Sequence, residues 1–171
     1  MTVIGTLLLL FGSNGLGYCL CRRKVTRRKQ TEELAELLEL MQAEIRCHQS
    51  MLAEAFLAIS DRLPGWRYFF LQELLKRMEQ QDGSTFVCMW KQSVNCISGQ
   101  TWLTGEEIRL WQEVGERIGF LDLQMQDQVL AQYIQRLRRI AAELEREEVQ
   151  SCKLYRVLSV AGGLLAAVLL L

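Results

Sequence analysis

Charge is absent from both ends of this 171-residue chain and concentrated in its middle. No Asp, Glu, Lys or Arg occurs in residues 1–21, and none occurs in residues 157–171. An α-helix of about 20 apolar residues crosses the hydrocarbon layer of a bilayer. Residues 1–21 therefore predict an N-terminal transmembrane helix. Residues 154–171 predict a second, shorter one that only just spans a bilayer at the rise of an α-helix.

Basic residues flank both apolar segments on the side that faces the middle of the chain. Lys153 and Arg156 accompany the second segment, and the first is followed by Arg22, Arg23, Lys24, Arg27, Arg28 and Lys29. Such flanks stay in the cytoplasm, so we expect a cytosolic middle, with both termini on the outer side of the membrane. A signal peptide, which carries its charge before the apolar run, and a buried soluble helix are the alternatives.

The organisation expected from these patterns has four parts. A transmembrane helix occupies residues 1–21 and a basic juxtamembrane segment occupies residues 22–30. A helical bundle follows over residues 31–153, and a second transmembrane helix occupies residues 154–171.

The middle of the chain is acidic. All 20 acidic residues lie between Glu32 and Glu148, and 13 Lys and Arg remain once the six-residue basic cluster and Arg156 are set aside. The resulting net charge of −7 argues against nucleic-acid binding, which needs a basic surface to displace counterions.

Apolar residues in the middle recur at the spacing of α-helices, and no stretch alternates as a strand would. We predict an all-α fold, an antiparallel bundle of about six helices flanked by the two membrane helices. Its last helix is expected to run without a break from Asp122 into the C-terminal anchor, because the only Gly or Pro residues in that stretch are Gly162 and Gly163.

Local signals predict where the helices begin and end. The expected N-terminal caps are Thr31, Ser84, Thr104 and Asp122, and a further helix is expected to begin near Ser50. Leu63, Pro64 and Gly65 form the strongest break in the chain, and Gly119 is placed to end a helix. Trp66, Trp90 and Trp111 are expected in the core, whereas Trp102 falls in a loop.

The residue types that carry chemistry do not form a recognisable site. The six cysteines contain no C-x-x-C pair, and His48 is the only histidine, so we predict no metal, cofactor or catalytic residue. Cysteines of a cytosolic domain are expected to stay reduced. A membrane enzyme or redox protein that uses Cys47, His48 or the pair Cys88 and Cys96 is the alternative.

An acidic bundle between membrane anchors suits a basic soluble partner, because complementary charge speeds the encounter. The candidate contacts are acidic residues on the later helices, namely Glu106, Glu113 and Glu116. Pairs of small residues in the apolar ends, such as Gly163 and Ala167, let helices approach closely in a membrane and are compatible with a homo-oligomer. A membrane-assembled signalling adaptor is a further alternative.

Several runs of the chain resemble the stage III sporulation protein AB family of endospore-forming bacteria. These are LMQAEI at 40–45, LAEA at 52–55, MWKQSV at 89–94, WQEVGERIG at 111–119 with Asp122, Gln126 and Gln128, and KLYRVL at 153–158 leading into AGGLL. Met51 stands where the family pattern commonly has a Pro. The resemblance covers nearly the whole chain.

The resemblance implies a cytosolic six-helix domain like that of the type II secretion platform protein, in the mother-cell membrane around the forespore. It further implies a scaffold in the channel complex between the two cells. The partners that it implies are stage III sporulation protein AA, a secretion-type ATPase, and other membrane proteins of the complex.

Overall fold

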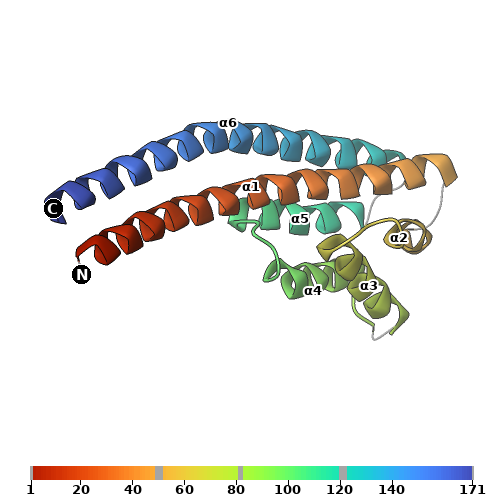
Figure 1. Ribbon diagram of the computed structural model, residues 1–171. Coiled ribbons are helices and arrows are strands. Elements are labelled where there is room, and N and C mark those ends of the chain that lie inside the picture. The colour runs from red at the N-terminus through yellow and green to blue at the C-terminus, as the bar shows by residue number, and fades with distance from the viewer. Residues whose placement is uncertain (1, 49–51, 81–82, 120–122, 171) are drawn as a thin grey trace. The chain divides into compact units, whose positions relative to one another are not determined.

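The computed structural model describes the backbone of residues 2–48, 52–80, 83–119 and 123–170. Side chains are described at 19, 21–46, 52–80, 83–119, 124–153, 157 and 161. These residues form six helices and no strand, which confirms the predicted all-α class. The helices are α1 (Thr2–His48), α2 (Leu52–Ser60), α3 (Trp66–Glu79), α4 (Phe86–Ser98), α5 (Gly105–Ile118) and α6 (Leu123–Leu170) (Figure 1).

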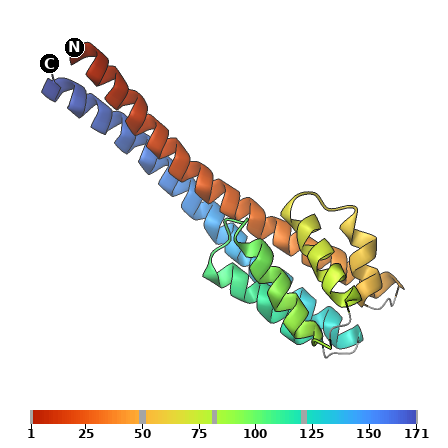
Figure 2. The same ribbon diagram turned by 90° about the horizontal axis from the view of Figure 1, so that it is seen from below.

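The chain divides into two compact units. One unit comprises residues 29–141, and the other combines residues 1–28 with residues 142–171. The first, which we call the bundle unit, holds the C-terminal part of α1, all of α2 to α5 and the N-terminal part of α6. The second, which we call the paired-end unit, holds the outer parts of α1 and α6. Within each unit the segments of α1 and α6 lie side by side in both views (Figures 1 and 2).

The first helix is longer than the sequence predicts. Thr31 is not an N-terminal cap but a fully buried residue in the interior of α1, which has already run from Thr2. The prediction was wrong because Thr followed by two Glu is only a local signal. No Gly or Pro occurs between Gly17 and Thr31, and the Arg and Lys residues in this stretch favour a helical conformation.

Most other boundaries are where local chemistry places them. Gly65 ends the Leu63 to Gly65 break with a φ of 72°, in the region that favours glycine. Thr104 forms a capping box with Glu107 at the start of α5, and Gly119 follows its end. The cap of α4 is Thr85 rather than Ser84. The helix starts predicted near Ser50 and at Asp122 lie outside the described residues, and so does Met51.

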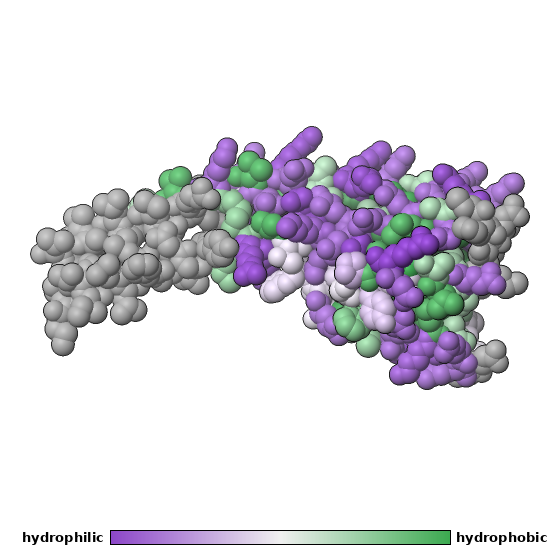
Figure 3. Space-filling model, turned by 45° about the vertical axis from the view of Figure 1, so that its right-hand side comes forward, coloured by the Kyte–Doolittle hydropathy of each residue, from purple (hydrophilic) through white to green (hydrophobic). Residues whose placement is uncertain are grey.

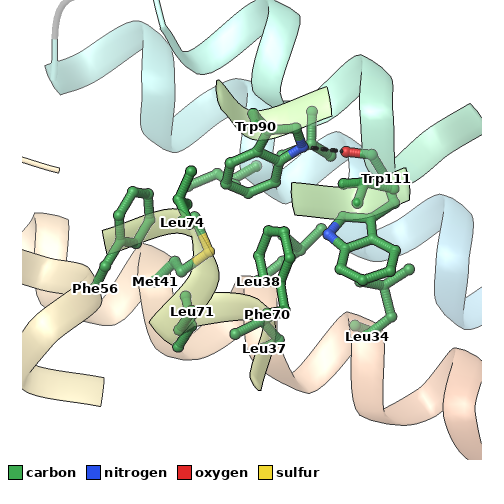
Figure 4. Close-up of a cluster of buried hydrophobic side chains, with 14 of the residues drawn as sticks. Leu34, Leu37, Leu38, Met41, Phe56, Phe70, Leu71, Leu74, Trp90 and Trp111 are labelled. Carbon is green, nitrogen blue, oxygen red and sulfur yellow. Dashed lines mark hydrogen bonds between the residues drawn. The ribbon is translucent and has the colours of Figure 1, made fainter. Parts of the chain in front are cut away.

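Aromatic side chains join the short helices of the bundle unit (Figure 4). The Phe70 ring on α3 lies 5.0 Å from the Trp90 ring on α4 and 4.6 Å from the Trp111 ring on α5. The Phe56 ring on α2 lies 6.1 Å from Trp90. Leu34, Leu37, Leu38 and Met41 of α1 are fully buried in the same cluster. The core therefore contains the Trp residues that the helical spacing predicts, and Trp102 is half exposed, as expected for a loop.

Gly115 in α5 and Gly119 just after its end make room for the aromatic residues of α4. A Cβ atom added to Gly115 would lie 2.1 Å from Cγ of Trp90, and one added to Gly119 would lie 2.7 Å from Cδ1 of Phe86. The Trp90 indole also donates a hydrogen bond of 2.7 Å from Nε1 to the carbonyl oxygen of Trp111 (Figure 4). The missing side chain at position 115 thus determines how closely α4 approaches α5.

Replacing Gly115 by Ala tests this packing. The added methyl group overlaps the Trp90 ring, so we expect Gly115→Ala to lower the free energy of unfolding by about 3 kcal/mol. Gly105→Ala is the control because an added Cβ meets nothing within 4 Å there, and its effect should stay below about 1 kcal/mol. Urea unfolding followed by circular dichroism measures both, and equal effects of the two substitutions would contradict the packing.

Candidate docking face

The three candidate acidic residues lie on α5, and each meets a group on a neighbouring helix. Glu106 lies 3.9 Å from the guanidinium of Arg136 on α6, and Glu113 accepts a hydrogen bond of 3.4 Å from the Tyr133 hydroxyl. Glu116 lies 2.5 Å from the ammonium of Lys91 on α4. We call these three acidic side chains and their partners the α5 face.

These pairs leave the α5 face available to a partner. The side chains of Glu106 and Arg136 are 53% and 57% exposed, and those of Glu116 and Lys91 are both 44% exposed. Exposed ion pairs contribute only about 0–1 kcal/mol to stability, so they can exchange for contacts with another protein at little cost. The face presents both signs of charge, whereas the sequence alone indicated only its acidic residues.

A shallow groove of about 250 Å³ adjoins this face, between the end of α5 and α6. Val129 and the Tyr133 ring line it together with Arg117, Gln132 and Arg136. Burial, with the nearby Glu113 carboxylate adding to it, raises the pKa of Tyr133 above its ordinary value of 10.0. The Tyr133 hydroxyl therefore stays protonated at neutral pH and can act as a hydrogen-bond donor.

A second acidic surface lies on α1 and was missed in the sequence. Glu32, Glu33, Glu36 and Glu39 line a groove of about 430 Å³ together with Lys29, Ala35 and Arg138. We call this surface the α1 groove. The spacing of Glu32, Glu36 and Glu39 at i, i+4 and i+7 indicates one helical face. The wrong helix start at Thr31 concealed it, because it assigned Glu32 and Glu33 to a first turn.

Three glutamates of the α1 groove also hold the bundle unit together. Glu33 accepts a hydrogen bond of 2.6 Å from the Trp66 indole, and Glu36 lies 2.6 Å from the buried guanidinium of Arg67 on α3. Glu39 lies 2.6 Å from Arg138 on α6. Charge changes at Glu33 or Glu36 would therefore disturb folding as well as binding, which makes the α5 face the better place for a test.

Asp127 links the start of α6 to α1. Its carboxylate accepts hydrogen bonds from Arg46, one of them 2.9 Å long, and another of 2.9 Å from the Gln42 amide. The hydrogen bond from Arg46 has the largest effect on Asp127 and outweighs the opposing effect of partial burial. With Gln42 and the Arg46 charge adding to it, the pKa of Asp127 lies below its ordinary value of 3.8.

The basic cluster after residue 21 lies within α1. Arg22, Arg23 and Lys29 are exposed. In the paired-end unit, the Lys24 ammonium donates a hydrogen bond of 2.8 Å to Ser151, and Arg28 lies 2.9 Å from Glu148. Lys153 is exposed, and the Arg156 side chain lies outside those described.

Cysteine pairing differs from the expectation of reduced thiols. Cys21 and Cys152 form a disulfide, with their Cα atoms 5.4 Å apart. The pairing was missed because 131 residues separate the two cysteines in sequence. Cys88 and Cys96, the pair considered for redox chemistry, are exposed free thiols two turns apart on α4. The side chains of Cys47 and His48 lie outside those described.

Within the described part of the chain, no helical stretch has the length and apolarity needed to cross a membrane. The side chains of residues 1–18, 154–156 and 162–171, which make up most of the two predicted spans, lie outside that part.

Comparisons with known proteins find one family and one fold. A family model described as stage III sporulation protein AB matches residues 2–171. A solved structure of a stage III sporulation protein AB superposes with a TM-score of 0.65 and 20% sequence identity, covering 73% of this chain and 98% of that one. No match is found among curated proteins.

The Asp127 link predicts a dependence of stability on acid. Because folding lowers the pKa of Asp127, its contribution is complete above the unfolded value near 3.8 and is lost as the pH falls through the lower folded value. We expect Asp127→Asn to destabilise the protein at pH 6 and the difference from wild type to shrink as the pH falls below 3.8. Asp61→Asn, at an exposed carboxylate just after α2, is the control.

Thermal unfolding between pH 6 and pH 2.5 measures this dependence. A constant difference between wild type and Asp127→Asn over that range would contradict the assignment.

Proposed function

This chain belongs to the stage III sporulation protein AB family and therefore has a role in sporulation, and from that membership we propose that it is a non-enzymatic membrane platform. Its bundle unit docks a secretion-type ATPase, stage III sporulation protein AA, in the channel complex between mother cell and forespore. The match over residues 2–171 is the observation that carries the proposal, because it includes both apolar ends as well as the helical domain.

The proposed placement follows the charge pattern of the chain. Residues 1–21 and 154–171 span the membrane of the mother cell around the forespore, and the bundle faces the cytosol with both termini outside. The basic residues from Arg22 to Lys29, with Lys153, stand on the cytosolic side of these spans. Other membrane proteins of the channel complex contact the two spans.

The α5 face is the proposed docking surface for the ATPase. Glu106 and Glu116 are exposed and are held by weak surface ion pairs, whereas Glu113 is half-buried beside Tyr133. A basic patch on the ATPase can therefore replace Arg136 and Lys91 as the partner of Glu106 and Glu116. Charge complementarity of this kind speeds association and makes it sensitive to salt.

The continuity of α6 supports a role for that helix in coupling ATPase docking to the membrane. It runs as one helix from Leu123 to Leu170 and so connects the bundle unit with the C-terminal apolar segment. In this proposal α6 alone connects the site where the ATPase docks with the channel components in the membrane.

Neutralising the α5 face tests the docking surface. We expect the triple variant Glu106→Gln, Glu113→Gln, Glu116→Gln to weaken ATPase binding by roughly tenfold or more at low salt and to reduce its salt dependence. The matched control is Glu143→Gln, Glu145→Gln, Glu147→Gln, which removes the same charge from exposed positions of α6. The proposed surface is wrong if both triple variants bind equally well while retaining wild-type helicity.

Interrupting α6 tests whether this helix couples docking to the membrane. Glu145 is an exposed residue within the helix, and a proline there removes a backbone hydrogen bond at a cost of about 3 kcal/mol. We expect Glu145→Pro to leave membrane insertion intact and to abolish sporulation in complemented cells, whereas Glu145→Ala should sporulate normally. Normal sporulation of the proline variant at wild-type protein levels would count against coupling through α6.

A further inference from the structure

We propose that Cys21 and Cys152 form a reversible disulfide that locks α1 to α6 in the paired-end unit. The two Cα atoms are 5.4 Å apart, within the range of 4.4–6.8 Å that disulfides require. The expectation of reversibility rests on the cytosolic placement proposed above, because disulfides in that compartment are usually transient.

Two further contacts hold the same helices in the same register. Lys24 donates a hydrogen bond of 2.8 Å to Ser151, and Arg28 lies 2.9 Å from Glu148. Positions 21, 24 and 28 lie on one face of α1. Their partners on α6 are 152, 151 and 148 in the same order, so the two helices run antiparallel here. These non-covalent contacts place the two cysteines together before any bond forms, so oxidation requires no movement of the backbone.

The surroundings of the pair favour exchange. Cys21 and Cys152 are both partly accessible to solvent, which lets a small thiol reach the bond. Arg22 and Lys24 flank Cys21, and the Lys24 ammonium is bonded to Ser151 beside Cys152. The thiolate is the form of cysteine that attacks disulfides.

The pairing is specific for Cys21. Cys19 is an exposed free thiol only two residues away, but two residues correspond to about 200° around a helix. Cys19 therefore lies on nearly the opposite side of α1 from Cys152. This position makes it a natural internal control.

The oxidant that the exchange needs is a low-molecular-weight disulfide. One protein thiolate attacks a sulfur of this molecule, which releases the first small thiolate and leaves a mixed disulfide on the protein. The second protein thiolate attacks the protein sulfur of that mixed disulfide and releases the second small thiolate. Two electrons pass from the two cysteines to the small disulfide, which becomes two thiols, and the reverse reaction opens the lock.

The lock constrains the whole bundle unit. The loop between Cys21 and Cys152 encloses residues 29–141, so closing it restricts the unfolded chain. In the oxidised protein α1 and α6 cannot slide past each other at this level. In the reduced protein the covalent link is absent, and non-covalent contacts such as the Lys24–Ser151 hydrogen bond and the Arg28–Glu148 ion pair resist such sliding.

Cysteine mapping of the full chain in detergent micelles tests the proposal. The protein is incubated with glutathione disulfide or with millimolar reduced glutathione, alkylated, digested and analysed by mass spectrometry. We expect a Cys21–Cys152 cross-link in the oxidised sample and its loss in the reduced one. Cys19→Ser should leave the cross-link unchanged, and Cys21→Ser should abolish it. The oxidised wild type should melt several degrees above the reduced form, and Cys21→Ser should show no such difference.

Three results would overturn the lock. These are a cross-link that runs through Cys19, no cross-link at Cys152 in glutathione disulfide, or a cross-link that millimolar thiol does not open. None of these measurements involves the ATPase, so a failure of the lock and a failure of the proposed docking are distinguishable.

Discussion

The contact of the Trp90 indole with the bare backbone of Gly115 is the constraint on which the bundle unit depends. It lets α4 approach α5 closely enough for the Trp90 N–H to bond the Trp111 carbonyl, and it presents the rest of the ring to Phe56 and Phe70. Aromatic rings supply large buried area with defined geometry, so four short helices are fixed by few residues. The α5 face then has a defined shape, because its acidic residues project from a helix that Trp90 positions.

The surface follows a different principle from the core. Figure 3 shows hydrophilic side chains over most of the visible part that the structure describes. Many of the charged groups meet an opposite charge on another helix, as Glu39 meets Arg138 and Arg46 meets Asp127. Pairs of this kind contribute little to stability individually, but they determine which charges a partner meets. The net charge of the middle therefore describes its docking properties less well than the pairing on each face does.

The sequence predicted features whose signal is local. The N-terminal cap at Thr104 and the break at Pro64 and Gly65 depend on residues within one turn of each other, and both were predicted correctly. The structure adds that Thr104 forms a capping box with Glu107. The start of α1 was not, because Thr31 and Glu32 resemble a helix start although the helix continues through them. The partners of Glu106, Glu113 and Glu116 lie on other helices. The two cysteines of the disulfide also lie on different helices, Cys21 on α1 and Cys152 on α6. Such pairs depend on how helices pack, which the spacing of apolar residues does not reveal.

Binding of the full chain, reconstituted in lipid nanodiscs, to stage III sporulation protein AA from the same organism tests the central claim most directly. Titrations at low and high salt would separate charge-driven docking from non-specific adsorption. The proposed platform predicts saturable binding that high salt weakens. No saturable binding by a folded, helical protein at either salt concentration would contradict it.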